Sequence, residues 1–445
     1  MATSIERSAE HPWYWTVHDS PTMLIGGSDT DNLFQWTGEK LQSQLDTLVE
    51  CGGNYVRNTM SDRKEGDVSA FAEIRPGLYD LDEWNEEYWN RLETFLTETA
   101  NRDIIVQLTF WDQHDLGTDR WRTHPWNPSN NRSYTSEESG LPEELDIDSW
   151  NERSAFFRTV EEENERVLNY QQRFVNKILD SALAHDHVLY NVGNESWAGN
   201  KWERYWAEFV HDRAVTEGLS IDVTNMTMEP DDTVRKAIES PDLFTYVDLS
   251  QHNQDAMGSS DQEHWNRLQM WRSKIEDALG PRPLNNVKIY GGFNGGNSAA
   301  GDAEEAIERA WRNLIGGCAS VRFHRPAGED ESWGIGLSER AQNQIEAMRT
   351  IVEAVEFYSL SPHQDILHDY PSNGAYCRAD PGHEYVVYIP EGDPVEIQLT
   401  DASFSLRWLQ TEVSEWVQET TVTGPRVSLR PPQQKNSVAI IRQTT

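Results

Sequence analysis

Short apolar segments alternate with longer amphipathic segments along the first 360 residues of the chain. The apolar segments are rich in β-branched residues, which is typical of strands buried on both faces of a parallel sheet. We predict strands at 22–26, 54–58, 104–110, 188–192, 221–228, 246–250, 287–290 and 320–323. Apolar residues at helical spacing predict helices at 38–50, 82–100, 152–185, 199–217, 232–240, 261–279, 302–315 and 337–357. Eight successive strand–helix pairs are what a closed (β/α)8 TIM barrel requires.

An open, doubly wound sheet is the alternative arrangement of alternating strands and helices. Such a sheet usually carries a Gly-rich phosphate turn after its first strand, and Ile25-Gly-Gly-Ser-Asp29 does not match that turn. Two long segments, 111–151 and 324–336, follow the third and eighth predicted strands. Because the strand-to-helix loops form the catalytic face of a barrel, we expect these two segments to cover the site.

The pattern changes near residue 360. From there on, short alternating strands are separated by turn sequences such as Asp380-Pro-Gly-His383. We predict strands at 374–379, 384–389, 395–399, 404–409, 427–430 and 437–441. The chain is therefore predicted to consist of a barrel at 1–360 and an all-β sandwich at 363–445, a size that suits such a module.

Acidic residues outnumber basic ones, with 75 Asp and Glu against 38 Lys and Arg and a formal net charge of -37. Such a field repels nucleic acid and acidic membrane surfaces, so neither is an expected partner. The acidity is dispersed and lysine is scarce, which resembles proteins of halophiles that accumulate salt. High ionic strength screens the repulsion among like charges in such proteins. A moderately acidic mesophilic protein is the alternative.

The three cysteines lie far apart and form no C-x-x-C spacing, so we expect neither a disulfide framework nor a thiolate metal site. Cys51 and Cys318 sit beside glycines just before predicted strands, which suits small buried side chains. The first residues lack a basic segment followed by an apolar one, so no signal peptide is expected. No apolar run approaches the roughly 18 residues that span a membrane. We therefore expect a cytoplasmic protein.

The fourth predicted strand delivers Asn194 and Glu195 to its carboxyl end, with Trp197 close behind. Protonating a glycosidic oxygen requires a carboxylic acid that is held partly desolvated. Residues 188–197 resemble the fourth-strand motif of glycoside hydrolase clan A, the retaining (β/α)8 glycosidases. The resemblance implies that Glu195 is the acid/base and that Asn194 binds the sugar 2-hydroxyl. The alternative is a solvated Glu at a helix N-cap.

Three further segments carry similar resemblances. Gly53-Asn-Tyr-Val-Arg-Asn58 is similar to the second-strand motif of the clan, which implies that Arg57 braces the catalytic carboxylates. A structural buried Arg is the alternative, and it would also need carboxylate partners. Asp248-Leu-Ser-Gln-His-Asn253 is similar to the sixth strand, which places His252 in the sugar site. The segment that begins at Tyr385 resembles the β-sandwich of apiosidase-like relatives.

The seventh predicted strand departs from the clan. A retaining member carries its nucleophilic Glu at the end of this strand, and here the chain has Gly291 and Gly292. One explanation is that the second carboxylate has moved. The candidates are Glu229, Asp112, Asp29 and the loop Glu329-Asp330-Glu331. The others are an inverting enzyme, whose carboxylates stand roughly 6.5–9.5 Å apart, and a site that binds sugar without cleaving it.

Aromatic, amide and cationic residues at the predicted strand ends are candidate substrate ligands. Flat aromatic rings stack on the C–H faces of sugars, and Arg or His binds a carboxylate or sulfate. The candidates are Trp111, His114, Trp197, Asn294, His324, Arg325 and Trp333. The tryptophans expected to pave the cleft also include Trp36, Trp121 and Trp126.

The sequence therefore predicts a glycoside hydrolase-like protein that binds a glycan at the carboxyl mouth of the barrel and uses Glu195 as general acid. It predicts no cofactor and no bound metal. A carbohydrate-binding pseudoenzyme is the first alternative, favoured by the missing strand-seven Glu. A metal-dependent barrel hydrolase is the second, favoured by the acids and imidazoles of Asp112, His114, His252 and His324.

Overall fold

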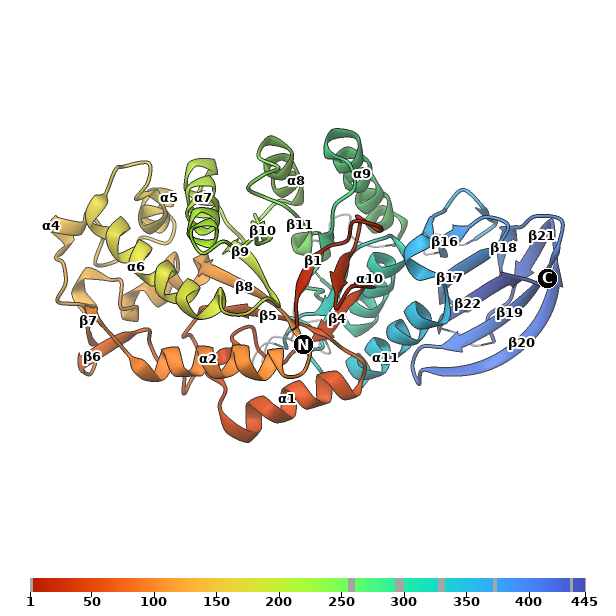
Figure 1. The fold of residues 1–445 in the computed structure, drawn as a ribbon, viewed down its shortest axis with the longest axis horizontal. Coiled ribbons are helices and arrows are strands. Elements are labelled where there is room, and N and C mark those ends of the chain that lie inside the picture. The colour runs from red at the N-terminus through yellow and green to blue at the C-terminus, as the bar shows by residue number, and fades with distance from the viewer. Residues whose placement is uncertain are drawn as a thin grey trace. The chain divides into compact units, whose positions relative to one another are not determined.

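The computed structural model describes residues 3–254, 261–292, 300–326, 333–370, 374–432 and 435–444. The chain folds as a (β/α)8 barrel followed by an all-β sandwich, as the sequence predicted (Figure 1). Parallel strands follow the order β10-β9-β8-β5-β4-β13. Strands β11 and β12 form a separate two-stranded pair. The region from β14 to β22 consists of two further sheets.

The chain divides into two compact units, and β5 (Tyr55–Thr59) belongs to both. Unit 1 comprises Met1–Ile5, Asp31–Leu45 and Arg57–Val247. Unit 2 comprises Glu6–Thr30, Asp46–Val56 and Asp248–Thr445. The predicted boundary between barrel and sandwich at 360–363 stays a prediction.

Unit 1 contains the third to fifth barrel strands and the helices that cover them. Its strands are β8 (Ile105–Asp112), β9 (Val188–Asn194) and β10 (Val223–Thr224), and its longer helices are α2 (Glu86–Ala100), α6 (Glu165–Ala182), α7 (Asn200–Thr216) and α8 (Pro230–Glu239). Helix α2 packs on β8, and α7 packs on β9. In the parallel pair β8–β9, Asp112 stands opposite Asn194. The two strands therefore end level with each other.

Unit 2 contains the strands on the other side of β5 and the sandwich. Its barrel elements are β4 (Leu24–Gly27), β12 (Leu284–Asn285), β13 (Ser320–Phe323), α9 (Asp261–Leu279), α10 (Ala303–Ile315) and α11 (Glu339–Ala354), and the sixth strand, β11 (Val247–Asp248), begins in unit 1. Leu249 N donates to Asn285 O, and Ile289 N donates to Arg322 O. These bonds link the sixth, seventh and eighth strands in order. Helix α1 (Gly38–Glu50) and β13 coincide with their predicted bounds.

Three barrel strands are shorter than predicted, because side chains take over hydrogen bonds of the backbone ladder. Strand β10 keeps two of the residues predicted at 221–228, and β11 two of those at 246–250. The seventh strand, predicted at 287–290, is assigned at β12 instead. Val287 N donates to Ser250 Oγ and Asn286 N donates to Ser320 Oγ, so neither amide is free for a neighbouring strand.

Two predicted helices begin later than expected. Residues 78–84 form strand β7 (Leu78–Trp84), paired with β6 (Phe71–Arg75), and the Asn85 side chain caps α2 by accepting from Glu87 N at 3.2 Å. The helix predicted at 152–185 is interrupted by α5 (Trp150–Arg153) and a 3-10 turn before α6 starts. Periodicity alone did not reveal these caps and turns.

The sandwich has a six-stranded and a three-stranded antiparallel sheet. Its strands are β14 (Ser361–Pro362), β15 (Leu367–His368), β16 (Tyr376–Asp380), β17 (Glu384–Glu391), β18 (Val395–Gln398), β19 (Ser403–Gln410), β20 (Glu415–Thr423), β21 (Arg426–Leu429) and β22 (Lys435–Gln443). Its core includes Val387, Trp408 and Ile441. Strand β20, at one edge of the larger sheet, was not predicted because most of its side chains are polar and exposed.

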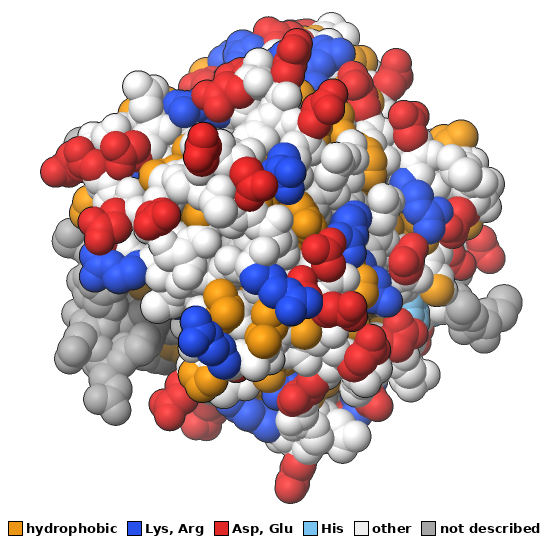
Figure 2. Space-filling view, turned by 90° about the vertical axis from the view of Figure 1, so that its left-hand side faces the viewer, with side chains coloured by type: hydrophobic (Ala, Val, Ile, Leu, Met, Phe, Trp, Pro, Cys, Tyr) orange, Lys and Arg blue, Asp and Glu red, His pale blue; other side chains and the backbone are white. Residues whose placement is uncertain are grey.

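The surface and the interior agree with the composition. Figure 2 shows Asp and Glu side chains scattered over the visible face and interspersed with Lys and Arg. The three cysteines are free and buried. Within the described ranges, no helix is both long enough and apolar enough to cross a bilayer.

Candidate functional site

The ends of β5, β8 and β9 meet through Asn194. Its amide nitrogen donates to Asp112 Oδ1 at 3.1 Å, and its amide oxygen accepts from Arg57 Nη2 at 2.8 Å. Both ends of the amide are therefore engaged, which fixes its orientation. The predicted neighbours Asn194 and Arg57 are brought together by this contact.

Arg57 is buried, with 1% of its side chain exposed, and it forms an ion pair with Asp31 at 3.2 Å. A buried guanidinium requires such a partner, because an isolated charge inside a protein is costly. Asp31 lies in the loop after the first barrel strand and was not singled out from the sequence. The only indication in the sequence was that a buried Arg57 needs a carboxylate partner.

Glu195 lies immediately after β9, and only 6% of its surface is exposed. Its backbone has a φ of +52°, in the left-handed region that residues other than Gly seldom adopt. The following residue is held in place, since Ser196 N donates to Met226 O at 2.8 Å. The strained backbone of Glu195 therefore sets the direction of its side chain. Residues with such strained backbones are concentrated at functional sites.

His114 is the hydrogen-bond partner of Glu195. Its Nε2 lies 2.7 Å from Glu195 Oε2, although 81 residues separate the two in sequence. The histidine belongs to the short helix α3 (Gln113–Leu116), which Asp112 caps by accepting from His114 N at 3.0 Å. Its side chain is 47% exposed, whereas that of Glu195 is 8% exposed. The imidazole therefore lies between the buried carboxylate and the solvent.

The hydrogen bond to Glu195 raises the pKa of His114 above its ordinary value, and burial only partly opposes this. The charges of Glu195 and Asp112 act in the same direction. An imidazolium and a carboxylate at this distance can share one proton. The pair can consequently deliver a proton to a group that approaches from solvent.

Asp112 is ionised and strongly paired. Burial would raise its pKa, but the charges of Arg63, His114 and Arg57 outweigh burial and hold the pKa below the usual range. Arg63 forms an ion pair with Asp112 and a longer one, of 3.5 Å, with Asp115. Asp115 lies on α3, in the segment 110–115 that the sequence also marked as a candidate loop, whereas Arg63 was not singled out because the loop after β5 brings it to the site.

The described side chains of the site do not form a cluster of metal ligands. Among the residues that the structure describes, no group of three or more His, Cys, Asp or Glu side chains is placed to hold a metal ion. Asp112 also faces guanidinium groups, which would oppose a cation at the same carboxylate.

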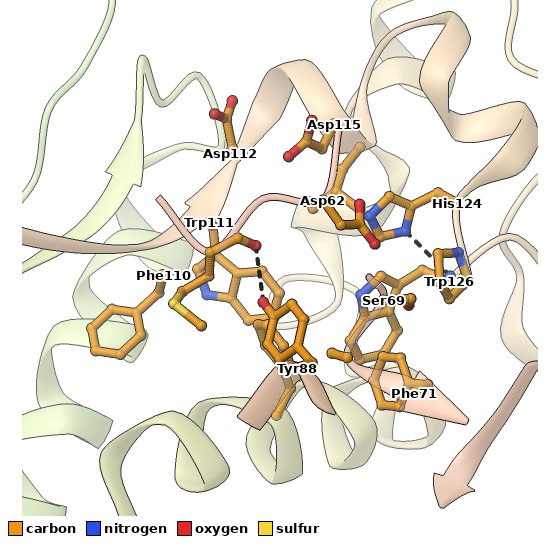
Figure 3. Close-up of a pocket in the computed structure, with 15 residues that line it drawn as sticks. Asp62, Ser69, Phe71, Tyr88, Phe110, Trp111, Asp112, Asp115, His124 and Trp126 are labelled. Carbon is orange, nitrogen blue, oxygen red and sulfur yellow. Dashed lines mark hydrogen bonds between the residues drawn. The ribbon is translucent and has the colours of Figure 1, made fainter. Parts of the chain in front are cut away.

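A cavity of about 30 Å³ lies next to the site and is shown in Figure 3. Its lining includes Tyr88, Trp111 and His124, with Asp112 and Asp115 at one side. This volume admits water molecules but not a sugar ring.

Trp111 was expected to stack on sugar, and this expectation is wrong. Its side chain is only 2% exposed, and its ring packs at 5.4 Å from Phe174 on α6 and at 5.3 Å from Trp206 on α7. Successive residues of a strand point to opposite faces, so Asp112 faces the site while Trp111 faces the helices. Trp121 and Trp126, also expected in the cleft, are likewise 2% exposed.

His252 was expected to line the sugar site, and it is a core residue instead. It is 1% exposed, its ring stacks on that of His264 at 3.8 Å, and its Nε2 lies 2.9 Å from the His264 carbonyl oxygen. The sixth strand ends early in a 3-10 turn, Ser250–Asn253, and this turn carries the ring into the packing against α9.

We expect this buried histidine to make folding pH-dependent. Burial lowers the pKa of His252 to about 3, below the roughly 6.5 of an exposed imidazole. The unfolded chain therefore binds the proton first, so the free energy of unfolding falls as the pH drops from about 6.5 towards 3. His252→Gln should reduce this slope by about 1.4 kcal/mol per pH unit between about pH 4 and pH 6, as measured by urea unfolding. His383→Gln, at an exposed position, is the control, and an unchanged slope in His252→Gln would contradict the account.

Several other predicted ligands belong to unit 2. His324 is 4% exposed and packs on Tyr290 at 4.6 Å between ring centroids, and Trp333 lies 6.2 Å from the same ring. Arg325 is half-buried. Asp29 is exposed and accepts from Leu337 N at 2.8 Å. Asn294 and the loop Glu329-Asp330-Glu331 lie outside the described residues.

The packing around Gly291 leaves no space for a carboxylate side chain at this position of the seventh strand. Gly291 has φ of +122°, and Gly291 N donates to Trp333 O at 3.0 Å. A Cβ at this position would collide with Asp302 O and lie 2.8 Å from Ala306 N. A glutamate therefore does not fit here unless the backbone moves. Glu229, another candidate carboxylate, is exposed at the start of α8 in unit 1.

Comparisons with known proteins agree with the fold. The family model described as "Domain of unknown function (DUF6298)" matches residues 63–260. No curated protein sequence matches the chain. Among solved structures, a glycoside hydrolase family 5 protein from Bacteroides vulgatus has a TM-score of 0.69 at 13% identity, over 99% of this chain and 93% of that one.

Two further solved structures are similar at lower scores. A glycoside hydrolase family 5 mannosidase from Rhizomucor miehei has a TM-score of 0.55 at 10% identity, over 79% of this chain and 98% of that one. A maltogenic alpha-amylase from Thermotoga neapolitana has a TM-score of 0.55 at 9% identity, over 95% and 99%. These likenesses show that the chain shares its fold with glycoside hydrolases.

Proposed function

We propose that this protein is a glycosidase that cleaves a glycan at the carboxyl end of β9, with Glu195 as the general acid. The observation that carries the proposal is the 2.7 Å contact between the buried Glu195 carboxylate and the half-exposed His114 imidazole. Glu195 follows β9, and His114 lies on α3, which follows β8. Solved structures that share this fold include glycoside hydrolases. A carbohydrate is accordingly the proposed partner.

The proposed reaction breaks the bond between the anomeric carbon and the glycosidic oxygen. The proton held between Glu195 and His114 passes to the leaving oxygen. Water supplies a hydroxyl group to the anomeric carbon, and the second carboxylate, acting as general base, takes the remaining proton of that water. Asn194 is held by Arg57 and Asp112, so its amide can be presented to a sugar hydroxyl in one orientation. Such preorganised groups lower the barrier because they need no rearrangement during the reaction.

The second carboxylate is proposed among Asp112, Glu229 and Asp29. Asp112 is the candidate within the hydrogen-bonded site, but its ion pair with Arg63 weakens it as a nucleophile. The ion pair between Asp112 and Arg63 disfavours a covalent intermediate on Asp112, and the crowding at Gly291 disfavours one on the seventh strand. Both therefore favour single displacement by water. We also retain Trp197, His324, Arg325 and Trp333 as proposed substrate ligands.

A non-catalytic carbohydrate-binding protein is the second candidate, favoured by the glycine at the end of the seventh strand. A panel of aryl glycosides at high salt concentration distinguishes the two. We expect release of the aryl group by the wild-type protein, unchanged by EDTA. Binding of glycans without release from any substrate would favour the binding protein, and loss of activity with EDTA would favour the metal-dependent alternative.

A further inference from the structure

An aromatic surface lies beside the proposed proton donor, and we call Trp150, Arg153 and Trp197 the Trp150 platform. Trp197 follows Glu195 by two residues and is half-buried. Trp150, on α5, is 54% exposed, and its ring centroid lies 5.8 Å from that of Trp197. An exposed tryptophan costs hydration free energy that the binding of an apolar face regains.

The platform is joined directly to the helix that carries His114. A Cβ on Gly117 would lie 2.9 Å from the Trp197 ring, so the ring packs against the backbone just after α3. His114 lies three residues earlier in the chain. The ring thus contacts the turn after α3 and belongs to the segment after β9, which are the two segments that bring His114 and Glu195 together.

Arg153 has no carboxylate partner among the residues that the structure describes. Its Cζ lies 4.7 Å from the centroid of the Trp197 ring, and its Nε donates to Gly117 O at 3.1 Å. Neither terminal nitrogen bonds to another residue within the described ranges, and no acidic side chain there lies within 4 Å of the guanidinium. Arg158, five residues further on, instead pairs with Glu162 at 2.8 Å.

The missing partner is unexpected in so acidic a chain. With 75 acidic residues for 38 basic ones, a guanidinium readily finds a carboxylate. Here the ring and the Gly117 carbonyl hold the guanidinium in one place while its two terminal nitrogens stay available. A planar guanidinium held in this way matches the two oxygens of a carboxylate or a sulfate.

The geometry points to an anionic glycan as the ligand of the Trp150 platform, with a sugar ring on Trp150 and a uronate or sulfate group on Arg153. This inference rests on the proposed function for its link to cleavage, but binding to the platform can be measured without cleavage. Carboxylate and sulfate share the chemistry that Arg153 recognises, and the test separates them.

The test uses the full chain carrying Glu195→Gln, so that no bound glycan is cleaved. This protein is applied to an array of neutral, uronate-containing and sulfated oligosaccharides at one fixed salt concentration. Dissociation constants are then measured by calorimetry for the anionic oligosaccharides bound and for their neutral counterparts. We expect uronate or sulfated oligosaccharides to bind in preference to neutral ones, and the array identifies which of the two.

Adding Arg153→Gln should weaken binding of the anionic oligosaccharide by about 10- to 100-fold and that of its neutral counterpart by less than about 3-fold. Arg153→Lys should restore part of the affinity. Arg158→Gln is the matched control and should change neither constant. Trp150→Ala should weaken both classes, because it removes the stacking surface.

Three results would overturn the inference: binding of neutral glycans alone, an array with no bound anionic glycan, or equal weakening of both classes by Arg153→Gln. If Arg153→Gln weakened the binding of both classes equally, Arg153 would have a purely structural role. The midpoint of thermal unfolding of Arg153→Gln would then also be lowered. The proposed glycosidase is judged separately, by release from aryl glycosides. Binding without cleavage would therefore support the Trp150 platform and contradict the proposed glycosidase.

Discussion

Replacing Glu195 by Gln is expected to lower the kcat/KM of glycoside cleavage by about 10²- to 10⁴-fold, the usual contribution of a general acid. Gln keeps the shape of the side chain and can still hydrogen-bond His114, but it cannot exchange a proton at this position. Cleavage is measured with the best aryl glycoside from the panel, at the salt concentration that gives the highest wild-type activity. Glu137→Gln, at an exposed position on the short helix Ser136–Ser139, is the control and should keep wild-type kinetics.

The outcome that speaks against the proposal is a Glu195→Gln protein with kcat/KM within about 3-fold of wild type. A folded variant is required for this comparison, so circular dichroism and the unfolding midpoint accompany the kinetics. Substrates with good leaving groups need less protonation, and the loss should therefore be smaller for them than for poor leaving groups. That dependence on the leaving group distinguishes loss of the acid from mere disturbance of the site.

Replacing Lys236 by Met is expected to destabilise the fold by about 3–5 kcal/mol. Lys236, on α8, forms an ion pair with the completely buried Glu203 of α7, and it lies 2.9 Å from Asp232. Burial raises the pKa of Glu203, while Lys236, Ser196 and Asn225 act to lower it. Removal of the lysine leaves a buried carboxylate without its cation, which is far more costly than loss of an exposed pair.

Urea unfolding of single and double variants measures this effect. Adding Glu203→Met to Lys236→Met should recover part of the lost free energy, since the uncompensated charge is then gone. Arg235→Gln breaks only exposed ion pairs with Asp232 and Glu239, and it should cost less than about 1 kcal/mol. A Lys236→Met protein as stable as wild type, or a double variant less stable than Lys236→Met alone, would show that the pair does not hold the two helices.

Both predictions concern the same turn. Glu195 has a left-handed backbone, and the Ser196 that follows lies beside the buried Glu203. The ion pair between α7 and α8 thus supports the segment that orients the proposed acid. We expect Lys236→Met to reduce activity as well, but through the population of folded protein.

The sequence by itself determined the barrel and the position of Glu195 at the end of its fourth strand. Local periodicity predicts these features, because strands buried on both faces are continuously apolar and surface helices are apolar on one side. Helix α1 and strand β13 were predicted to the residue for this reason. Strand β20 was missed because its exposed edge leaves no apolar pattern.

Only the tertiary structure decided which side chains surround Glu195. Asp112 and His114 come from the end of β8, Arg57 from β5 and Asp31 from the loop after β4. Their meeting depends on the register of β8 against β9 and on the course of the loops. The same packing put Trp111 and His252 into the core and left no space for a side chain at Gly291. Contacts between residues some 80 positions apart depend on how all elements pack together, and a local pattern does not contain that information.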